Sequence, residues 1–476
     1  MKMRAFALTC CVSLAITPLA NGAQSAPTSL ALTGGTVIDV RTGASMADAT
    51  VLIRDDRIVQ IGHGDDVRIP PGAQVVSVNG RWIVPGFIDM HVHVATVEGA
   101  PLELYVANGV TAIRDLGGNI TVLRLMREAA ATANDRPKPR LFFAGAMLDG
   151  KPPSAPRMSI MVDTPERAAS AVNLLVDQTA DAIKVYNGIT EPVLEAIAAA
   201  ARARHVPVVG HIPRALTARR AVDLGMSGIE HSIIRSRDLQ EWSILTPAEF
   251  ARIQTLSSVT ERDALVWSHL DLTAGPLRAL LADLAKKAVF FDPTLSIDEY
   301  DTLFLYPAEA EHPNNRYLKR SFVAANLGPE HEAFRLPEAM RAAAAAGLAK
   351  RREFVGMCYR AGITLVAGTD GPGIGRLAPG FGLQHELQLL VEAGLTPLSA
   401  LRAATIDAAR ALHREHALGT IEAGKFADLV ILGANPVEDI KNASNIAGVV
   451  VKGKFFARPA LDQLLRQLEA EARAAT

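Results

Sequence analysis

Short apolar runs alternate with amphipathic stretches through most of the chain beyond residue 86. Eight such runs occur, and helical spacing follows them, as in Thr164–Gln178 and Glu191–Arg204. Strands that alternate with helices pair in parallel through right-handed crossovers, and eight such units are the number at which a parallel sheet closes into a barrel. The pattern therefore predicts an α/β fold, a (β/α)8 TIM-like barrel over residues 86–415. The predicted strands are Phe87–Val94, Val110–Leu116, Arg140–Leu148, Asp181–Tyr186, Val206–Ile212, Gly228–Ile233, Val289–Leu295 and Ile363–Asp370.

The two ends of the chain have a different pattern, with β-rich runs separated by tight turns. Residues 27–85 and residues 416–458 both show it, and Asp55-Asp56-Arg57 is typical of a hairpin turn between two of the runs. The simplest arrangement pairs the two segments with each other. We therefore expect a small β-sandwich built from both the N- and C-terminal segments, followed by an amphipathic helix over residues 459–476.

The first 23 residues are typical of a secretory signal peptide. Lys2 and Arg4 precede an apolar run to about Ile16, and small residues follow up to Ala23. The run is too short to span a membrane. We expect export to the periplasm or beyond, with no membrane attachment of the mature chain. After cleavage only Cys358 of the three cysteines remains, so no internal disulfide is expected.

Composition excludes some classes of partner. A hydrophobic content of 49% and a charged content of 21% are typical of a folded globular chain. The formal net charge is −1 and no dense block of Lys and Arg occurs, so a nucleic-acid partner is not expected. We expect a small-molecule substrate and a homo-oligomer.

Polar and ionisable residues stand where the predicted strands end, and active sites of barrels are built at the C-terminal ends of their strands. His91 and His93 are two residues apart at the end of the first strand, so they point to the same side. Each residue alone could be a cap or a solvated side chain. Together, imidazole and carboxylate groups at one mouth favour a site for zinc-like metal ions. The other four residues are Lys184, His211, His231 and Asp370, at the ends of strands four, five, six and eight.

Lysine is the unusual member of this set. Its amine is a poor ligand while protonated, at a reference pKa of about 10.4. Beside two divalent ions, a neutral amine can react with carbon dioxide to give a carbamate that bridges both metals. Carboxylation of Lys184 is therefore an inference that the residue type suggests.

These residues, with the motif Pro85-Gly86-Phe87-Ile88-Asp89-Met90-His91-Val92-His93, resemble the amidohydrolase superfamily of metal-dependent hydrolases. The resemblance implies that His91, His93 and Asp370 bind one metal and that His211 and His231 bind the second. Carboxylated Lys184 would bridge two divalent ions, with zinc as the default. Segments Phe381–Pro397 and Ala400–Thr405 are similar to the Xaa-Pro dipeptidase and imidazolonepropionase-related subgroup. Members of that subgroup cleave amide bonds of dipeptides and N-acyl amino acids, including ochratoxin-type amides.

The expected mechanism uses a metal-bridging hydroxide, since two metals lower the pKa of a shared water toward about 7. Asp370 would accept the proton of this water and pass it to the leaving amine as general base and acid. Tyr186 lies two residues after Lys184 and so points to the same interior. It is a candidate for substrate binding. The candidates for a substrate carboxylate are Arg114, Arg214, Arg235 and His385. Asp292, which ends the seventh strand, is interpreted as a turn residue.

Three alternatives stay open. A mononuclear deaminase or cyclic-amide hydrolase could use the same scaffold, but such deaminases place a glutamate shortly after the fifth-strand histidine, and here Ile212-Pro213-Arg214 follows His211. A lactonase or a phosphotriesterase-type hydrolase would share the two metals and the bridging lysine. A non-catalytic binding protein would be expected to have lost ligands, and every expected ligand position is filled.

Overall fold

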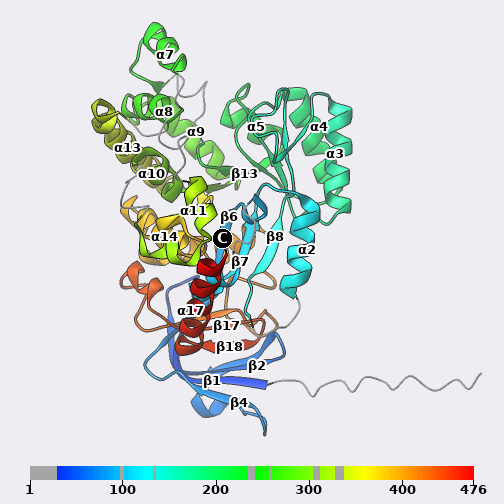
Figure 1. The fold of residues 1–476 in the computed structure, drawn as a ribbon, viewed down its shortest axis with the longest axis vertical. Coiled ribbons are helices and arrows are strands. Elements are labelled where there is room, and N and C mark those ends of the chain that lie inside the picture. Colours follow the sequence, from blue (N-terminus) through cyan, green and yellow to red (C-terminus); the bar gives the residue numbers. More distant parts are fainter. Residues whose placement is uncertain are drawn as a thin grey trace, which may run out of the picture.

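The computed structural model describes residues 29–96, 101–131, 136–233, 242–256, 259–303, 311–326 and 337–475. The predicted signal peptide lies outside these residues. Two regions make up the described chain, a β-sheet at one end and a larger part of parallel strands and helices (Figure 1). No described helix combines the length and the apolar character that a membrane span requires.

Both ends of the chain contribute strands to one eight-stranded sheet, as the pattern of short runs predicts. The order is β18-β17-β16-β5-β1-β2-β3, with β4 also paired to β1. The two ends meet where β5 pairs antiparallel with β16, for example Val84 opposite Val430, so blue and red strands lie together in Figure 1. All eight strands from the two chain ends belong to this single sheet, so the predicted two-layer sandwich stays a prediction. The strands are β1 (Ser29–Ile38), β2 (Ser45–Arg54), β3 (Arg57–His63), β4 (Gln74–Ser77), β5 (Trp82–Pro85), β16 (Leu429–Leu432), β17 (Ile446–Val451) and β18 (Lys454–Ala457).

The central strands are all parallel, and each of the eight predicted runs overlaps at least one of them. They form a three-stranded sheet, β6-β7-β8, and a seven-stranded sheet in the order β10-β9-β11-β12-β13-β14-β15. The third predicted run is divided at Gly145, whose φ of 76° ends β8 before β9 begins. The strands are β6 (Phe87–Val92), β7 (Val110–Asp115), β8 (Arg140–Phe143), β9 (Met147–Asp149), β10 (Ser159–Met161), β11 (Ile183–Val185), β12 (Val208–Gly210), β13 (Met226–Glu230), β14 (Phe290–Asp292) and β15 (Thr364–Leu365).

Backbone hydrogen bonds connect the two parallel sheets on two sides. On one side Met90 N donates to Ala367 O (2.9 Å) and Asp370 N donates to His91 O (2.8 Å). On the other side Asp181 N donates to Phe143 O (2.8 Å). The strand pairing is that of two separate parallel sheets, so the single closed barrel stays a prediction. The first of these two connections places Asp370 directly beside His91.

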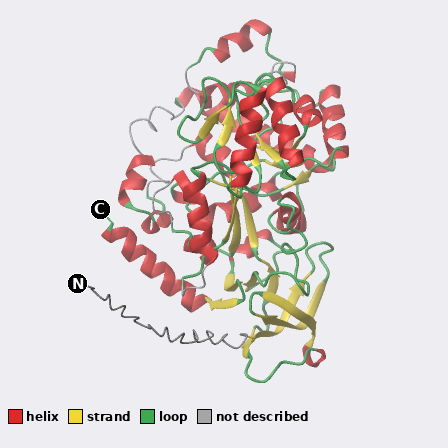
Figure 2. Ribbon diagram, turned by 90° about the vertical axis from the view of Figure 1, so that its right-hand side faces the viewer, coloured by secondary structure: helices red, strands yellow, loops and turns green. Residues whose placement is uncertain are grey.

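Helices lie around the parallel strands (Figure 2). The two predicted examples are confirmed as α3 and α4, and Thr164 caps α3 by accepting a hydrogen bond from Arg167 N. The α-helices in this part are α1 (Glu103–Ala107), α2 (Ile120–Ala131), α3 (Pro165–Asp177), α4 (Glu191–Ala203), α5 (Ala218–Leu224), α9 (Gly275–Lys286), α13 (Arg341–Arg360), α14 (Phe381–Glu392), α15 (Pro397–Ala403) and α16 (Ile406–Ala411).

The long connections after β13 and β14 carry helices of their own, as expected. They are α7 (Pro247–Gln254) and α8 (Val259–Ser268) after β13, and α10 (Leu295–Leu303), η3 (Pro313–Tyr317) and α11 (Arg320–Asn326) after β14. The last helix, α17 (Arg458–Ala474), matches the predicted terminal helix and buries Leu461, Leu464 and Leu468. It packs against α1 and η3. Because η3 belongs to the long connection after β14, the last helix stabilises part of that connection.

Candidate metal centre

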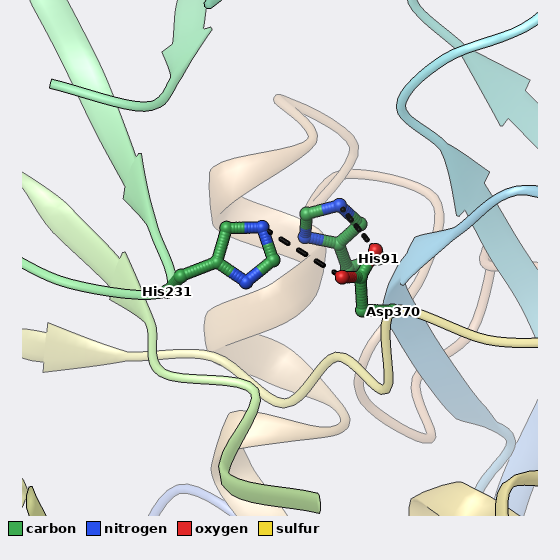
Figure 3. A group of neighbouring side chains, drawn as sticks. All are labelled: His91, His231 and Asp370. Carbon is green, nitrogen blue, oxygen red and sulfur yellow. Dashed lines mark ion pairs between the residues drawn. The ribbon is translucent and has the colours of Figure 1, made fainter. Parts of the chain in front are cut away.

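Asp370 stands at the middle of the predicted ligand set. Its Oδ1 lies 3.2 Å from Nε2 of His91 and 3.0 Å from Nε2 of His93. Its Oδ2 lies 3.9 Å from Nε2 of His231 (Figure 3). These side chains come from residues 91, 93, 231 and 370, so three distant parts of the chain meet at one carboxylate.

The other two predicted ligands complete the cluster. Nζ of Lys184 lies 3.4 Å from Nε2 of His91, and Lys184 is almost fully buried. The ring of His211 has its centroid 4.7 Å from that of His231, which in turn lies 4.8 Å from that of His91. The structure therefore brings all six residues together.

Local backbone geometry explains why these side chains point inward. His231 and Asp370 both follow a strand and have left-handed φ angles of 64° and 56°, conformations that are uncommon for residues other than glycine. Both are held by backbone bonds, His231 N to Asp292 O (2.7 Å) and Asp370 N to His91 O (2.8 Å). Just before His211, a Cβ at Gly210 would collide with the carbonyl oxygen of Val185. Two of the residues with this uncommon backbone conformation thus stand at the strand ends that carry the cluster.

Each of the four histidines uses Nδ1 for a hydrogen bond away from the centre. His91 bonds to Glu230 Oε2 (3.0 Å) and His93 to Gly117 O (3.2 Å). His211 bonds to Asn187 Oδ1 (3.0 Å) and His231 to Thr294 Oγ1 (2.8 Å). Carboxylate, carbonyl and amide oxygens accept hydrogen bonds, so Nδ1 carries the proton in the first three and Nε2 carries a lone pair. The bonds fix ring orientation as they do in metal-binding histidines.

The chemistry of this donor set fits a metal. The lone pairs at Nε2 of His91 and His93 face Oδ1 of Asp370 at about hydrogen-bond distance. Two acceptors at this distance repel each other unless a proton or a cation lies between them. Imidazole nitrogens and a carboxylate are ligands of Zn²⁺ and related ions. The arrangement is therefore one that a bound cation would stabilise.

Burial and charge shift the pKa values in the cluster. Burial lowers the pKa of His91 to about 4, aided by the neighbouring Lys184, which keeps this imidazole neutral. Burial likewise lowers the pKa of Lys184 to about 8, although Glu230 and Asp370 oppose the shift. Burial raises the pKa of Asp370, but the surrounding histidines outweigh it and hold that pKa well below its usual range. A neutral amine is therefore more accessible at Lys184 than at a solvated lysine, whose pKa is about 10.4.

The predicted substrate contacts differ in how close they lie to the cluster, and Arg235 lies outside the described residues. The Tyr186 ring lies beside the ligand set, with its centroid 4.2 Å from that of His211. Arg214 is exposed, and its backbone N–H donates to Asn187 O (3.0 Å), next to the Asn187 side chain that holds His211. His385, on α14, is ion-paired with Glu299 of α10 at 3.2 Å. Tyr186 and Arg214 thus border the cluster, whereas His385 is engaged by another side chain.

The predicted roles of Arg114 and Asp292 are wrong, because both side chains are buried. Arg114 is fully buried behind His91, where Nη2 lies 2.8 Å from Glu230 Oε1 and Nε donates to Met90 O (2.6 Å). It therefore cannot reach a substrate carboxylate. Asp292 is the last residue of β14, as predicted, but it is fully buried in the same group and is not a turn residue.

Sequence reasoning also missed Glu230, Asn187 and Thr294, the partners of three histidines. The sequence did contain a signal for Glu230. Glu230 interrupts the apolar run Gly228–Ile233, and Arg114 interrupts the run Val110–Leu116, and both runs predict buried strands. Such charges are rarely buried unless they are paired.

Comparison with known proteins identifies the class. The sequence profile of the Amidohydrolase family matches residues 82–456, so the chain belongs to the amidohydrolase family. It is a hydrolase that acts on carbon–nitrogen bonds. Among curated proteins, it is 26% identical over 418 residues to imidazolonepropionase from Symbiobacterium thermophilum, which covers 82% of this chain and 87% of that protein. It is also 36% identical over 72 residues to adenine deaminase from Paracoccus denitrificans, a match that spans only 15% of this chain and 12% of the deaminase.

Solved structures share the fold. A bottromycin amidohydrolase superposes with a TM-score of 0.73 at 24% identity, over 94% of this chain and 91% of its own. A prolidase complexed with N-methylphosphonate-L-proline has a TM-score of 0.65 at 23% identity, over 90% and 100%. The ochratoxinase of A. niger has a TM-score of 0.62 at 20% identity, over 91% and 96%. At these identities the likeness concerns the fold.

Proposed function

We propose that this chain is a binuclear metal-dependent hydrolase that cleaves amide bonds of small substrates carrying a free carboxylate. Xaa-Pro or other dipeptides, N-acyl amino acids and ochratoxin-type amides make up the substrate class. The observation that carries the proposal is the convergence of four imidazoles, one lysine and one carboxylate, with Nδ1 of every imidazole engaged elsewhere. The names of the structural neighbours, a prolidase, an ochratoxinase and a bottromycin amidohydrolase, support amide cleavage.

The six residues would divide between two divalent ions, zinc by default. His91, His93 and Asp370 would hold the first, and His211 and His231 the second. Lys184 would bridge them after its neutral amine forms a bond to the carbon of carbon dioxide and loses a proton. Bound metals of this kind supply a water of lowered pKa and polarise a carbonyl oxygen.

Asp370 stands where the residue that moves the proton would stand. Its depressed pKa keeps the carboxylate ionised at neutral pH, and its oxygens face the centre of the cluster. It would take a proton at one Oδ from the attacking water and return it to the amine nitrogen that leaves. Tyr186 would orient the scissile carbonyl or the substrate carboxylate. Among the described residues, Arg214 is an exposed cationic candidate for that carboxylate.

Three further expectations belong to the same proposal. The parallel strands would close as a (β/α)8 barrel, and the sheet from both chain ends would fold over as a sandwich. The chain would be exported after removal of residues 1–23. It would act as a homo-oligomer on a small molecule without a nucleic-acid or membrane partner.

A panel of substrates tests the proposal. Xaa-Pro dipeptides, N-acyl amino acids, aryl amides, lactones and an imidazolone would be offered to zinc-loaded and to chelated protein. Hydrolysis only of amides with a free carboxylate, lost on chelation and restored by zinc, supports the proposal. Activity confined to lactones would overturn it.

The imidazolonepropionase match over most of the chain favours one second candidate, a mononuclear cyclic-amide hydrolase. That enzyme would open the imidazolone ring and contain one metal per chain. The panel and the metal content therefore distinguish the two functions.

A further inference from the structure

Behind His91 lies a buried ion pair that the proposed chemistry does not use. Oε2 of Glu230 accepts a hydrogen bond from Nδ1 of His91 (3.0 Å), and Oε1 lies 2.8 Å from Nη2 of Arg114. Nε of Arg114 donates to the carbonyl oxygen of Met90 (2.6 Å), the residue that precedes His91. The side chains of all three charged or ionisable residues are buried, with 2% exposure at most. One guanidinium therefore ties β6, β7 and β13 together directly behind a predicted ligand.

This partner distinguishes His91 from the other three histidines. Their Nδ1 atoms bond to a backbone carbonyl, an amide oxygen and a hydroxyl, all of them neutral. A hydrogen bond to a carboxylate is charge-assisted and roughly twice as strong as one between neutral groups. A carboxylate behind a ligand histidine also raises the basicity of the nitrogen that faces the metal. The four imidazoles are thus unequal as donors.

Arg114 decides which buried carboxylate plays this part. Asp292 is also fully buried and its Oδ2 lies 3.9 Å from Nη2 of Arg114. Among the described residues, neither oxygen of Asp292 has a hydrogen-bond partner. The guanidinium is placed against Glu230 instead, and it offsets the cost of burying that carboxylate next to His91.

We propose that Glu230 and Arg114 are positioning residues that make the two metal positions unequal. They hold Nε2 of His91 toward the centre and strengthen it as a donor. The position formed by His91, His93 and Asp370 therefore binds its metal more tightly than the position formed by His211 and His231. The inference rests on the proposed binuclear function.

Replacing Glu230 by Gln tests the charge while keeping the size. A glutamine oxygen can still accept from His91, but its NH₂ group then faces the donor groups of Arg114. Zn²⁺ affinities would be measured by competition with a chromophoric chelator, without any turnover assay. We expect Glu230→Gln to weaken the tighter of two sites by about 10–100-fold, the range typical for loss of such a partner, and to change the other by less than threefold.

Two control variants make the readout site-specific. Asp292→Asn makes the same carboxylate-to-amide change in the same buried group without a bond to His91, and both affinities should stay within threefold of wild type. Asn187→Ala removes the partner of His211 and should weaken the second site instead. If Glu230→Gln does not fold, Arg114→Lys keeps the charge but loses the bond to Met90, and it should weaken the same tighter site.

The outcomes separate this inference from the function it rests on. Two sites in wild type, with both weakened equally or neither weakened by Glu230→Gln or by Arg114→Lys, would overturn the positioning role alone. If Asp292→Asn and Glu230→Gln lowered the Zn²⁺ affinity equally, both residues would have only a structural role. That result would also overturn the positioning role. Fewer than two sites in wild type would overturn the binuclear proposal, and with it the inequality.

Discussion

Replacing Asp370 by Asn isolates proton transfer from metal binding. The residue has a φ of 56°, and Asn is one of the few residues that tolerate this conformation, so the backbone should be kept. Oδ1 is the atom nearest to His91 and His93, at 3.2 Å and 3.0 Å, and the amide oxygen of Asn can take its place. What is lost is a carboxylate that stays ionised at neutral pH because the histidines depress its pKa.

The expected loss follows from that role. General acid–base catalysis contributes about 10²–10⁴-fold, which corresponds to about 3–5 kcal/mol of transition-state stabilisation. Asp370→Asn should therefore lower kcat by that factor for an N-acyl amino acid or an Xaa-Pro dipeptide. Metal content, measured by mass spectrometry of the elements on the same sample, should stay near two per chain.

A matched control separates catalysis from folding. Asp428 is a buried carboxylate just before β16, held by Nε of Arg140 at 2.5 Å, at the opposite end of the parallel strands from the cluster. Asp428→Asn should cost stability but leave kcat within a few-fold of wild type. Unchanged turnover in Asp370→Asn would remove that residue from proton transfer. Parallel loss of metal and activity would make it a ligand only.

Three further predictions concern pH, stability and substrate binding. Burial raises the pKa of Glu386 to about 7, so the native state binds more protons than the unfolded state between about pH 4.5 and 7, and stability from this group is lost as pH rises through 7. Relative to Glu386→Gln, wild type should lose roughly 3 kcal/mol of unfolding free energy over that window, measured in denaturant at each pH; parallel curves would contradict the shift. Leu461→Ala should lower the unfolding free energy by about 2–5 kcal/mol because this fully buried side chain anchors α17, while exposed Gln463→Ala should change it by less than about 0.5; equal effects would refute docking of the helix through Leu461. Tyr186→Phe should reduce kcat/KM by about tenfold, the value of one hydrogen bond, with unchanged metal content; an unaltered kcat/KM would show that the hydroxyl does not contact substrate.

Much of the architecture could be predicted because periodicity reports local structure directly. Alternating apolar runs and helical stretches placed a strand in each of the eight predicted runs, and the amphipathic spacing of the last residues placed α17. The break at Gly145 was not foreseen, since an isolated glycine inside an apolar run does not reveal its φ angle. The pairing into two parallel sheets depends on contacts between distant segments, which periodicity does not encode.

The same division holds for the site. Strand ends gather at one edge, so His91, His93 and Asp370 could be placed together from their positions alone. Arg114 was misassigned because a strand-end cation can face either the substrate or the core, and only the location of Glu230 decides between them. The role of Asn187 was invisible for a similar reason: an amide after a strand is usually a turn residue.

Counting the metal ions tests the central claim most directly. Wild-type protein, purified without chelator and loaded with zinc, should contain two ions per chain, and anomalous diffraction at the zinc edge should place both between Lys184 and the four histidines. One ion per chain, or density for zinc away from Asp370, would contradict the account.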